Sequence, residues 1–190
     1  MDFILNLDAS VLLWIQENLR ADWLTPFMVF YTKLGGLGLI WILTSLVFLC
    51  FKKTRWAGVA GLMALAFSLA VNNVCLKRLI ARIRPYEVIE GLQLIGKNAT
   101  DFSFPSGHTG SSFAAATAFF WTFKKGKARW ILILGAALMA FTRLYIGIHY
   151  PTDIIGGLIT GSLCGYAAYR IIDFVRGKWE AYWNTRRTAK

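Results

Sequence analysis

The chain of 190 residues has the length of one domain, and its composition is far from that of a water-soluble protein. Hydrophobic residues make up 56% and charged residues 16%, with a mean hydropathy of +0.50, which excludes an ordinary soluble surface. The formal net charge of +11 is typical of nucleic-acid binding, but here the basic residues stand in short groups between apolar runs, as in membrane loops. We therefore expect an all-α integral membrane protein, a single membrane-embedded domain over residues 1–190, with no nucleic-acid partner.

Residues 1–22 differ from the rest of the chain. Their apolar residues recur at helical spacing: Ile4, Leu7, Val11, Ile15 and Leu19. This pattern predicts an amphipathic helix at the membrane interface, with Trp14 as an anchor. The alternative is an ordinary sixth helix of the bundle. A signal peptide is not expected, because Asp2 and Asp8 stand where a basic region should be.

Five further segments are candidates to cross a bilayer as helices. They cover residues 34–51, 56–76, about 108–123, about 130–148 and 151–175. The fold class expected is thus a bundle of five to six transmembrane helices with an N-terminal amphipathic helix. On the last segment, Gly157, Gly161 and Gly165 form a face of small residues that permits close helix packing. That face favours packing within a monomer over a weak homodimer.

The distribution of Lys and Arg predicts the orientation of these spans. Thirteen of them lie in loops 52–55 and 124–129 and in the segment from residue 170 onward, and eight lie on the other side. The positive-inside rule places the larger group in the cytoplasm. We therefore expect a multi-pass protein of the cell membrane with a cytoplasmic C-terminus. Both histidines of the chain then lie on the extracytoplasmic side.

Polar side chains gather in that outer layer. The second span ends in KRLIARIRP (77–85), the third opens with PSGH (105–108), and the fourth leads into TRLYIGIHYPTD (142–153). Seven of their residues would meet at one membrane face: Lys77, Arg84, Ser106, His108, Arg143, His149 and Asp153. Ionisable residues at helix ends in a bilayer are costly unless they are paired or functional. Segment 86–104, on the same side, could cap the site or lie on the membrane.

These residue types suit phosphoryl transfer. Lys77, Arg84 and Arg143 supply positive charge, and each Arg can bind two phosphate oxygens at once. The amides of Ser106 and Gly107, at the start of a helix, form an anion site.

The two imidazoles can divide the remaining work. One can attack phosphorus, while the other protonates the leaving oxygen. Asp153, four residues after His149, is the candidate to fix the tautomer of that imidazole. Few other carboxylates lie in the outer layer, so we expect no metal and no cofactor.

The three motifs resemble those of the type 2 phosphatidic acid phosphatase family, whose active site is related to that of vanadium haloperoxidases. The family pattern of Lys, six residues and Arg-Pro matches residues 77–85, and Pro-Ser-Gly-His matches 105–108. The third pattern, Ser-Arg, five residues, His, three residues and Asp, matches 142–153. Thr142 stands where the family usually has Ser. The catalytic motifs thus cover residues 77–153.

The resemblance implies a role for each residue. His149 would be the nucleophile, oriented by Asp153, and His108 would be the general acid for the leaving group. Five residues would hold the phosphate: Lys77, Arg84, Ser106, Gly107 and Arg143.

The resemblance also implies an integral-membrane lipid phosphatase, with a lipid phosphate as substrate. Short bacterial members resemble undecaprenyl-diphosphate phosphatases, and Arg78, Arg82 and Lys97 could hold the second phosphate. A phosphatidylglycerophosphate or phosphatidate phosphatase is the alternative. A haloperoxidase would share the site residues, but the apolar spans favour a lipid substrate. A small membrane transporter is the non-enzyme alternative, although it would place polar residues near the membrane midplane.

Overall fold

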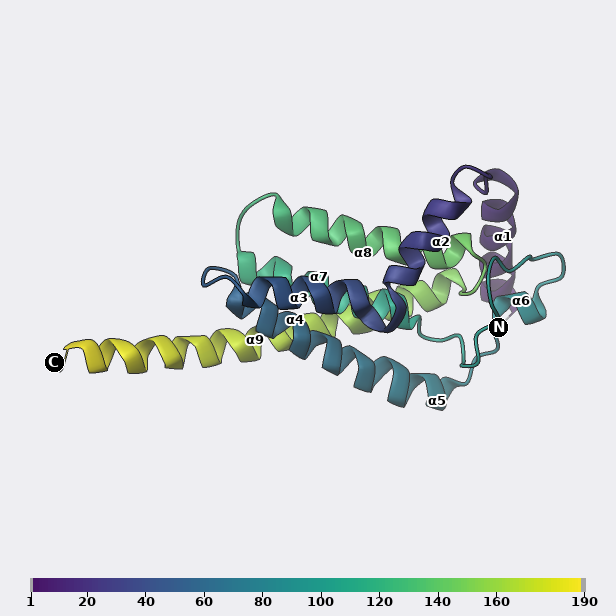
Figure 1. Ribbon diagram of the computed structural model, residues 1–190. Helices are drawn as coiled ribbons and strands as arrows, with labels where there is room; N and C mark the ends of the chain where they lie inside the picture. The colour runs from purple at the N-terminus through teal and green to yellow at the C-terminus, as the bar shows by residue number, and fades with distance from the viewer. Residues whose placement is uncertain (1, 189–190) are drawn as a thin grey trace.

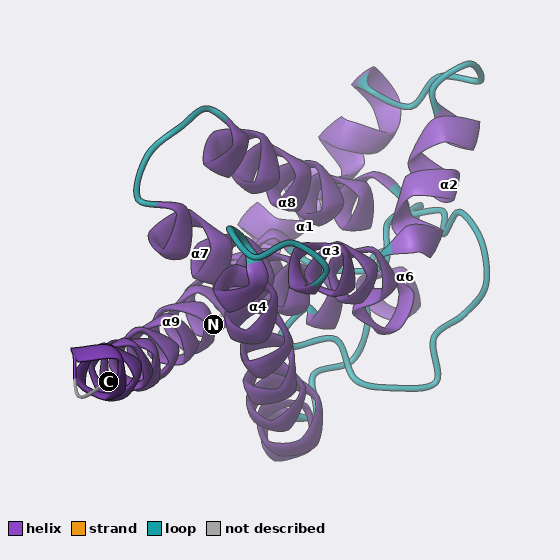
Figure 2. Ribbon diagram, turned by 60° about the vertical axis from the view of Figure 1, so that its left-hand side comes forward, coloured by secondary structure: helices purple, strands orange, loops and turns teal. Residues whose placement is uncertain are grey.

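The computed structural model describes residues 2–188, and within them every regular element is a helix (Figure 2). The α-helices are α1 (Asp2–Asn18), α2 (Thr25–Leu34), α3 (Leu39–Leu49), α4 (Arg55–Ser68), α5 (Lys77–Ile80), α6 (Pro85–Val88), α7 (Gly107–Phe123), α8 (Ala128–Tyr145) and α9 (Pro151–Thr188). A 3₁₀ turn, η1 (Gly36–Gly38), joins α2 to α3, and a π-helix, η2 (Leu69–Leu76), joins α4 to α5. The predicted all-α class is confirmed for this part of the chain.

Helix α7 is the centre of the bundle, in contact with α4, α8 and α9. Helix α9 runs along the molecule and extends beyond the other helices at its C-terminal end, while α1 stands across the opposite end (Figure 1). With 38 residues α9 is about 57 Å long, nearly twice the ~30 Å of a hydrocarbon core.

Two stretches are long and apolar enough to cross a membrane, Arg55–Val88 and Ala128–Tyr145. The bent pair α2 and α3, with an angle of 52° between its halves, becomes a third if it counts as one span. The described residues thus contain two or three spans by length and composition, and the count of five to six stays a prediction.

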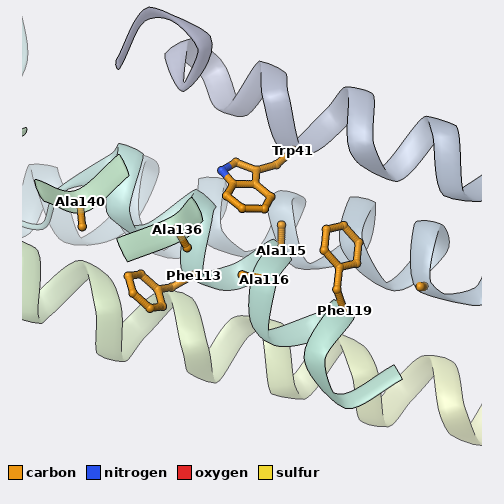
Figure 3. Packing of buried hydrophobic residues seen from close by; sticks show 8 residues of the cluster. Trp41, Phe113, Ala115, Ala116, Phe119, Ala136 and Ala140 are labelled. Carbon is orange, nitrogen blue, oxygen red and sulfur yellow. The ribbon is translucent and has the colours of Figure 1, made fainter. Parts of the chain in front are cut away.

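Small side chains make the body of the bundle compact. Trp41 and Phe119 pack over a floor of alanines between α3, α4, α7 and α8 (Figure 3). The Trp41 indole N–H donates a 2.7 Å hydrogen bond to Ser112, so its one polar atom is satisfied inside the core. A second cluster, also rich in alanine, lies between α4, α7 and α9.

The glycine face of α9 packs against α7 within the same chain. A methyl group at Gly157, Gly161 or Gly165 would meet backbone carbonyl oxygens of Ser106, Gly110 or Ala114 at less than a normal contact distance. The face thus packs within one chain, since only glycine lets the two backbones come this close. The oligomeric state stays a prediction.

The π-helix ends where the first catalytic motif begins. A π-helical turn holds more residues than an α-helical turn, so it rotates the residues after it about the helix axis. Here it precedes Lys77, which is buried, whereas its neighbours Arg78 and Leu79 are exposed.

Helix α1 forms where the amphipathic helix was predicted, and one of its sides packs against the rest of the protein. Asp8, Leu12 and Ile15 are buried, whereas Ile4 and Leu7 are exposed. The sequence pattern considers apolar residues only, so it does not indicate that the carboxylate Asp8 lies on the side of α1 that packs against the protein. Whether α1 lies at the membrane interface stays a prediction.

Candidate active site

The three motifs meet at the end of the bundle that α1 covers. They line a cavity of about 580 Å³, into which both predicted histidines and all three predicted cations project. Its polar end is formed by Lys77, Arg84, Gly107, His108, Arg143 and His149. The opposite wall is apolar and comes from η1, α3 and α4, through Leu37, Ile42, Leu62 and Leu65 among others. The cavity is thus lined by charged residues on one part of its surface and by apolar residues on another.

His149 lies in the turn between α8 and α9, and its two ring nitrogens face different partners. Nδ1 is 3.3 Å from Asp153 Oδ2, and Nε2 is 3.4 Å from Arg84 Nη1. An arginine can only donate, so Nε2 accepts and Nδ1 carries the proton. Burial, with the charges of Arg143 and Arg84, lowers the pKa of His149 to about 3, although the hydrogen bond that Nδ1 donates to Asp153 acts to raise it. The imidazole is therefore neutral at pH 7, with its lone pair on Nε2.

Asp153 is fixed by several donors in the first turn of α9. Its Oδ2 accepts from the Tyr150 amide at 2.9 Å and from the Ser103 hydroxyl, as well as facing His149. Its Oδ1 accepts from Arg82 at 2.8 Å. The carboxylate therefore cannot rotate away from the imidazole without breaking several hydrogen bonds.

A carboxylate that the motifs do not include occupies the cation site. Asp101 bonds both Lys77 and Arg84, the latter at 2.5 Å, and it comes from segment 86–104. Burial alone would raise the pKa of Asp101, but the hydrogen bond and charge of Lys77, with the charge of Arg84, outweigh it and lower the pKa. Segment 86–104 therefore contributes to the site.

Arg143 reaches the same cavity from the last turn of α8. It is buried, its Nη1 donates to Thr32 Oγ1 at 2.6 Å, and its Nε has no hydrogen-bond partner in the described part of the chain. A buried donor without a partner costs about 1–3 kcal/mol, which a bound anion would recover. Helix α2 thus holds Arg143 through the Thr32 hydroxyl.

Ser106 is used differently from its neighbours. Its hydroxyl is fully buried and caps α7, lying 3.4 Å from the Thr109 amide and 3.0 Å from Thr109 Oγ1. Gly107 and His108, by contrast, line the cavity. Ser106 thus shapes the helix N-terminus beside the cavity, and direct contact with phosphate stays a prediction for its side chain.

Several residues at the site lie outside the motifs. Four of them have polar contacts with motif residues: Asp8, Thr32, Asp101 and Ser103. Asp101 and Ser103 lie just before PSGH in the chain, which is the one sequence signal that could have drawn attention to them. Asp8 and Thr32 were missed because their elements reach the site only through tertiary packing. Arg82 lies inside the 77–85 motif, at a position that the family pattern leaves open, and it bonds Asp153.

The second-phosphate hypothesis loses one of its three cations. Arg82 is bound to both Asp8 and Asp153, each at 2.8 Å, so its charge is already neutralised. Arg78 and Lys97 are exposed. A second phosphate would therefore have only these two of the three cations available.

Residues 58–176, which include every motif, match the sequence model of the PAP2 superfamily. The chain belongs to this superfamily. It is 32% identical over 149 residues to an undecaprenyl-diphosphatase of Sulfolobus acidocaldarius, covering 78% of this chain and 70% of the relative. It is 27% identical over 186 residues to a lipid A 4'-phosphatase of Bacteroides thetaiotaomicron, covering 90% and 79%.

A solved structure shares the fold. The transmembrane PAP2-type phosphatidylglycerolphosphate phosphatase of Bacillus subtilis superposes with a TM-score of 0.76 at 23% identity, covering 92% of this chain and 89% of that one. This chain is therefore a membrane phosphatase of the PAP2 superfamily. Its relatives are named for three different lipid substrates, so the family by itself does not decide which lipid is cleaved.

Proposed function

We propose that the chain hydrolyses a lipid phosphate through a phosphohistidine intermediate on His149. One observation carries the proposal: neutral His149 presents Nε2 at the polar end of an apolar cavity, with Nδ1 held by Asp153. A lone pair on Nε2 is what in-line attack on phosphorus requires. Lys77, Arg84 and the unpartnered Nε of Arg143 are the groups to bind the phosphoryl oxygens.

In the first step, Nε2 of His149 forms a bond to phosphorus while the bond from phosphorus to the leaving oxygen breaks. The leaving oxygen keeps the electron pair and takes a proton from His108, which lines the same cavity. Asp153 stabilises the positive charge that develops on the His149 ring. Water then attacks phosphorus, His108 takes its proton, and His149 is released with inorganic phosphate.

The reaction is proposed to need no metal. The described residues contain no cluster of three or more His, Cys, Asp or Glu side chains that could hold one. Fixed cations can neutralise the phosphoryl oxygens in its place. We expect phosphate release to survive excess EDTA and to be inhibited by vanadate, a trigonal-bipyramidal mimic. Complete loss with EDTA and recovery with magnesium would contradict this.

Undecaprenyl diphosphate is the proposed substrate. The support is the resemblance of short bacterial members and the 32% identity to a protein named for that activity. The test is phosphate release from a long prenyl diphosphate, phosphatidate and phosphatidylglycerophosphate at matched mole fractions in detergent. We expect the highest kcat/KM for the prenyl diphosphate. A tenfold preference for either of the others would overturn this substrate, and no release from any of them would favour the transporter hypothesis.

The site is proposed to face the extracytoplasmic side, with the C-terminus in the cytoplasm, on the Lys and Arg asymmetry of the loops. Cysteines introduced at Asn98 and Lys125 lie near opposite ends of the bundle. We expect a membrane-impermeant thiol reagent added to intact cells to modify Asn98→Cys only. Modification of Lys125→Cys only would reverse the orientation.

A further inference from the structure

Helix α1 contributes a buried carboxylate, Asp8, which is linked through Arg82 to Asp153, the partner of His149. The Asp8 side chain is 2% exposed, although it comes from a helix with an exposed apolar side. Its Oδ2 accepts from Arg82 at 2.8 Å and from the Thr152 hydroxyl at 2.5 Å, and its Oδ1 accepts from the Thr152 amide at 3.1 Å. These three hydrogen bonds fix both oxygens of the Asp8 carboxylate.

Arg82 connects Asp8 to the catalytic carboxylate. Its Nη2 bonds Asp8, while its Nη1 bonds Asp153 Oδ1 at 2.8 Å and Thr152 Oγ1 at 2.6 Å. Its guanidinium also stacks on the Tyr150 ring, 3.7 Å from the ring centroid. The guanidinium is thus fixed in position and direction, and it occupies the one Asp153 oxygen that does not face His149.

The charges of Asp8, Arg82 and Asp153 explain why the site has two carboxylates around one arginine. Arg82 and Asp153 alone would be a neutral pair, and the arginine would withdraw negative charge from the oxygen that faces His149. With Asp8 present, the three side chains carry one net negative charge. That charge lies directly behind the ring that becomes positive when His149 is phosphorylated.

We propose that Asp8 and Arg82 are positioning residues for phosphoryl transfer, which act through Asp153 on His149. The inference rests on the proposed function. Arg82 holds the orientation of Asp153, and Asp8 restores the negative charge that Arg82 would otherwise cancel. Helix α1, outside the three motifs, is thereby part of the active site.

Helix α1 has other contacts that keep it docked when Asp8 is changed. Leu12 packs with Leu92 and Tyr150 in an apolar cluster. Gln16 exchanges hydrogen bonds with the backbone of Gly91 and Gln93 at 3.0 and 2.8 Å. A substitution at Asp8 therefore tests its charge more than the presence of the helix.

The test compares Asp8→Asn with Glu17→Gln, which makes the same charge change at an exposed position of the same helix. Turnover of p-nitrophenyl phosphate by the full chain in detergent isolates attack by His149, since this leaving group needs no proton. We expect Asp8→Asn to lower kcat by 10- to 100-fold with KM changed less than threefold, and Glu17→Gln to keep the wild-type kcat. The rates are divided by the folded fraction, measured by size-exclusion chromatography.

The kcat of the double variant Asp8→Asn with Arg82→Gln separates the effect of charge from an effect of helix docking. It restores one net negative charge at Asp153, so its kcat should exceed that of Asp8→Asn and stay below wild type. The inference is overturned if Asp8→Asn keeps kcat within twofold, or if the double variant falls below Asp8→Asn. If Asp8→Asn does not fold, a wild-type kcat in the double variant overturns the inference. A wild-type chain that turns over neither p-nitrophenyl phosphate nor any lipid phosphate overturns the proposed function as well.

Discussion

The two regions of this molecule are held together in different ways. The body of the bundle packs alanine and glycine between α4, α7 and α9, so the backbones themselves come into contact. The site end buries polar side chains that bond one another, such as Asp153, which pairs with the charged Arg82 and accepts a hydrogen bond from the neutral His149. The body therefore depends on the size of side chains, and the site end on their charge and hydrogen bonds. Substitutions in the two regions should consequently have effects of different kinds.

The largest effect is expected at the site end, on turnover. His149→Ala removes the nucleophile and should lower kcat by roughly 10⁴-fold or more, as for the loss of other catalytic nucleophiles. It should also abolish the phosphoenzyme that acid-free quenching traps from radiolabelled substrate. Thr142→Ser is the matched control, because the Thr142 hydroxyl bonds the Met139 carbonyl of its own helix at 2.7 Å. Phosphoenzyme in His149→Ala would contradict the assignment.

The next effect separates the second histidine from the first. His108→Ala removes proton donation to the leaving group, which contributes typically 10²–10⁴-fold. The loss in the rate of phosphoenzyme formation should be seen with a lipid phosphate and should largely disappear with p-nitrophenyl phosphate, whose leaving group is stable as an anion. Phosphoenzyme formation is measured because His108 takes the proton of water only in the later step, which both substrates share. Equal loss on both substrates would mean that His108 does not act as the acid.

In the body of the bundle, the effect should be on stability. Gly161→Leu places a side chain against the Gly110 backbone, and overpacking of this kind costs about 1–3 kcal/mol or more. Gly177→Leu makes the same change on the same helix, where a Cβ meets nothing within 4 Å. We expect a lower unfolding temperature in detergent for Gly161→Leu only. Equal unfolding temperatures in the two variants would show that the glycine face does not need its small residues.

The smallest effect, counted per pH unit, is a pH dependence of stability that arises at the site end. The pKa of His149 is lowered to about 3 in the fold, against ~6.5 in an unfolded chain. Between these values the unfolded chain binds the proton and the folded chain does not, so this stability is present above pH 6.5 and is lost as pH falls. The slope is at most about 1.4 kcal/mol per pH unit. His149→Gln should reduce the slope measured by denaturant unfolding between pH 6.5 and 4, and an unchanged slope would contradict the shift.

The sequence was informative wherever chemistry restricts residue identity. Residues 77–153 carry the motifs, and the structure brings their histidines and cations to one cavity, as expected from their placement at span ends. The glycine face was also predictable, because its spacing of four residues follows from helix geometry.

The rest could not be read from the sequence because it depends on contacts between distant segments. Asp8 is 74 residues from Arg82 in the chain, and nothing in the local pattern of either residue indicates the other. Thr32 stands between Tyr31 and Lys33, and this context does not indicate that it holds Arg143 from another helix. The π-helix before Lys77 was equally hidden, since local sequence rules do not distinguish it from an α-helix.

The ion pairs of Asp101 have a consequence for the thermodynamics of binding. Lys77 and Arg84 both pair with this one carboxylate, which balances one of their two positive charges, so a phosphate does not enter a site of bare cations. It must exchange with an anion of the protein itself, and the observed affinity is the difference between two ion-pairing energies. The same exchange works in reverse after hydrolysis, when the carboxylate competes with inorganic phosphate for the two cations. If the two cations bind phosphate as proposed, Asp101 is an internal competitor for the product.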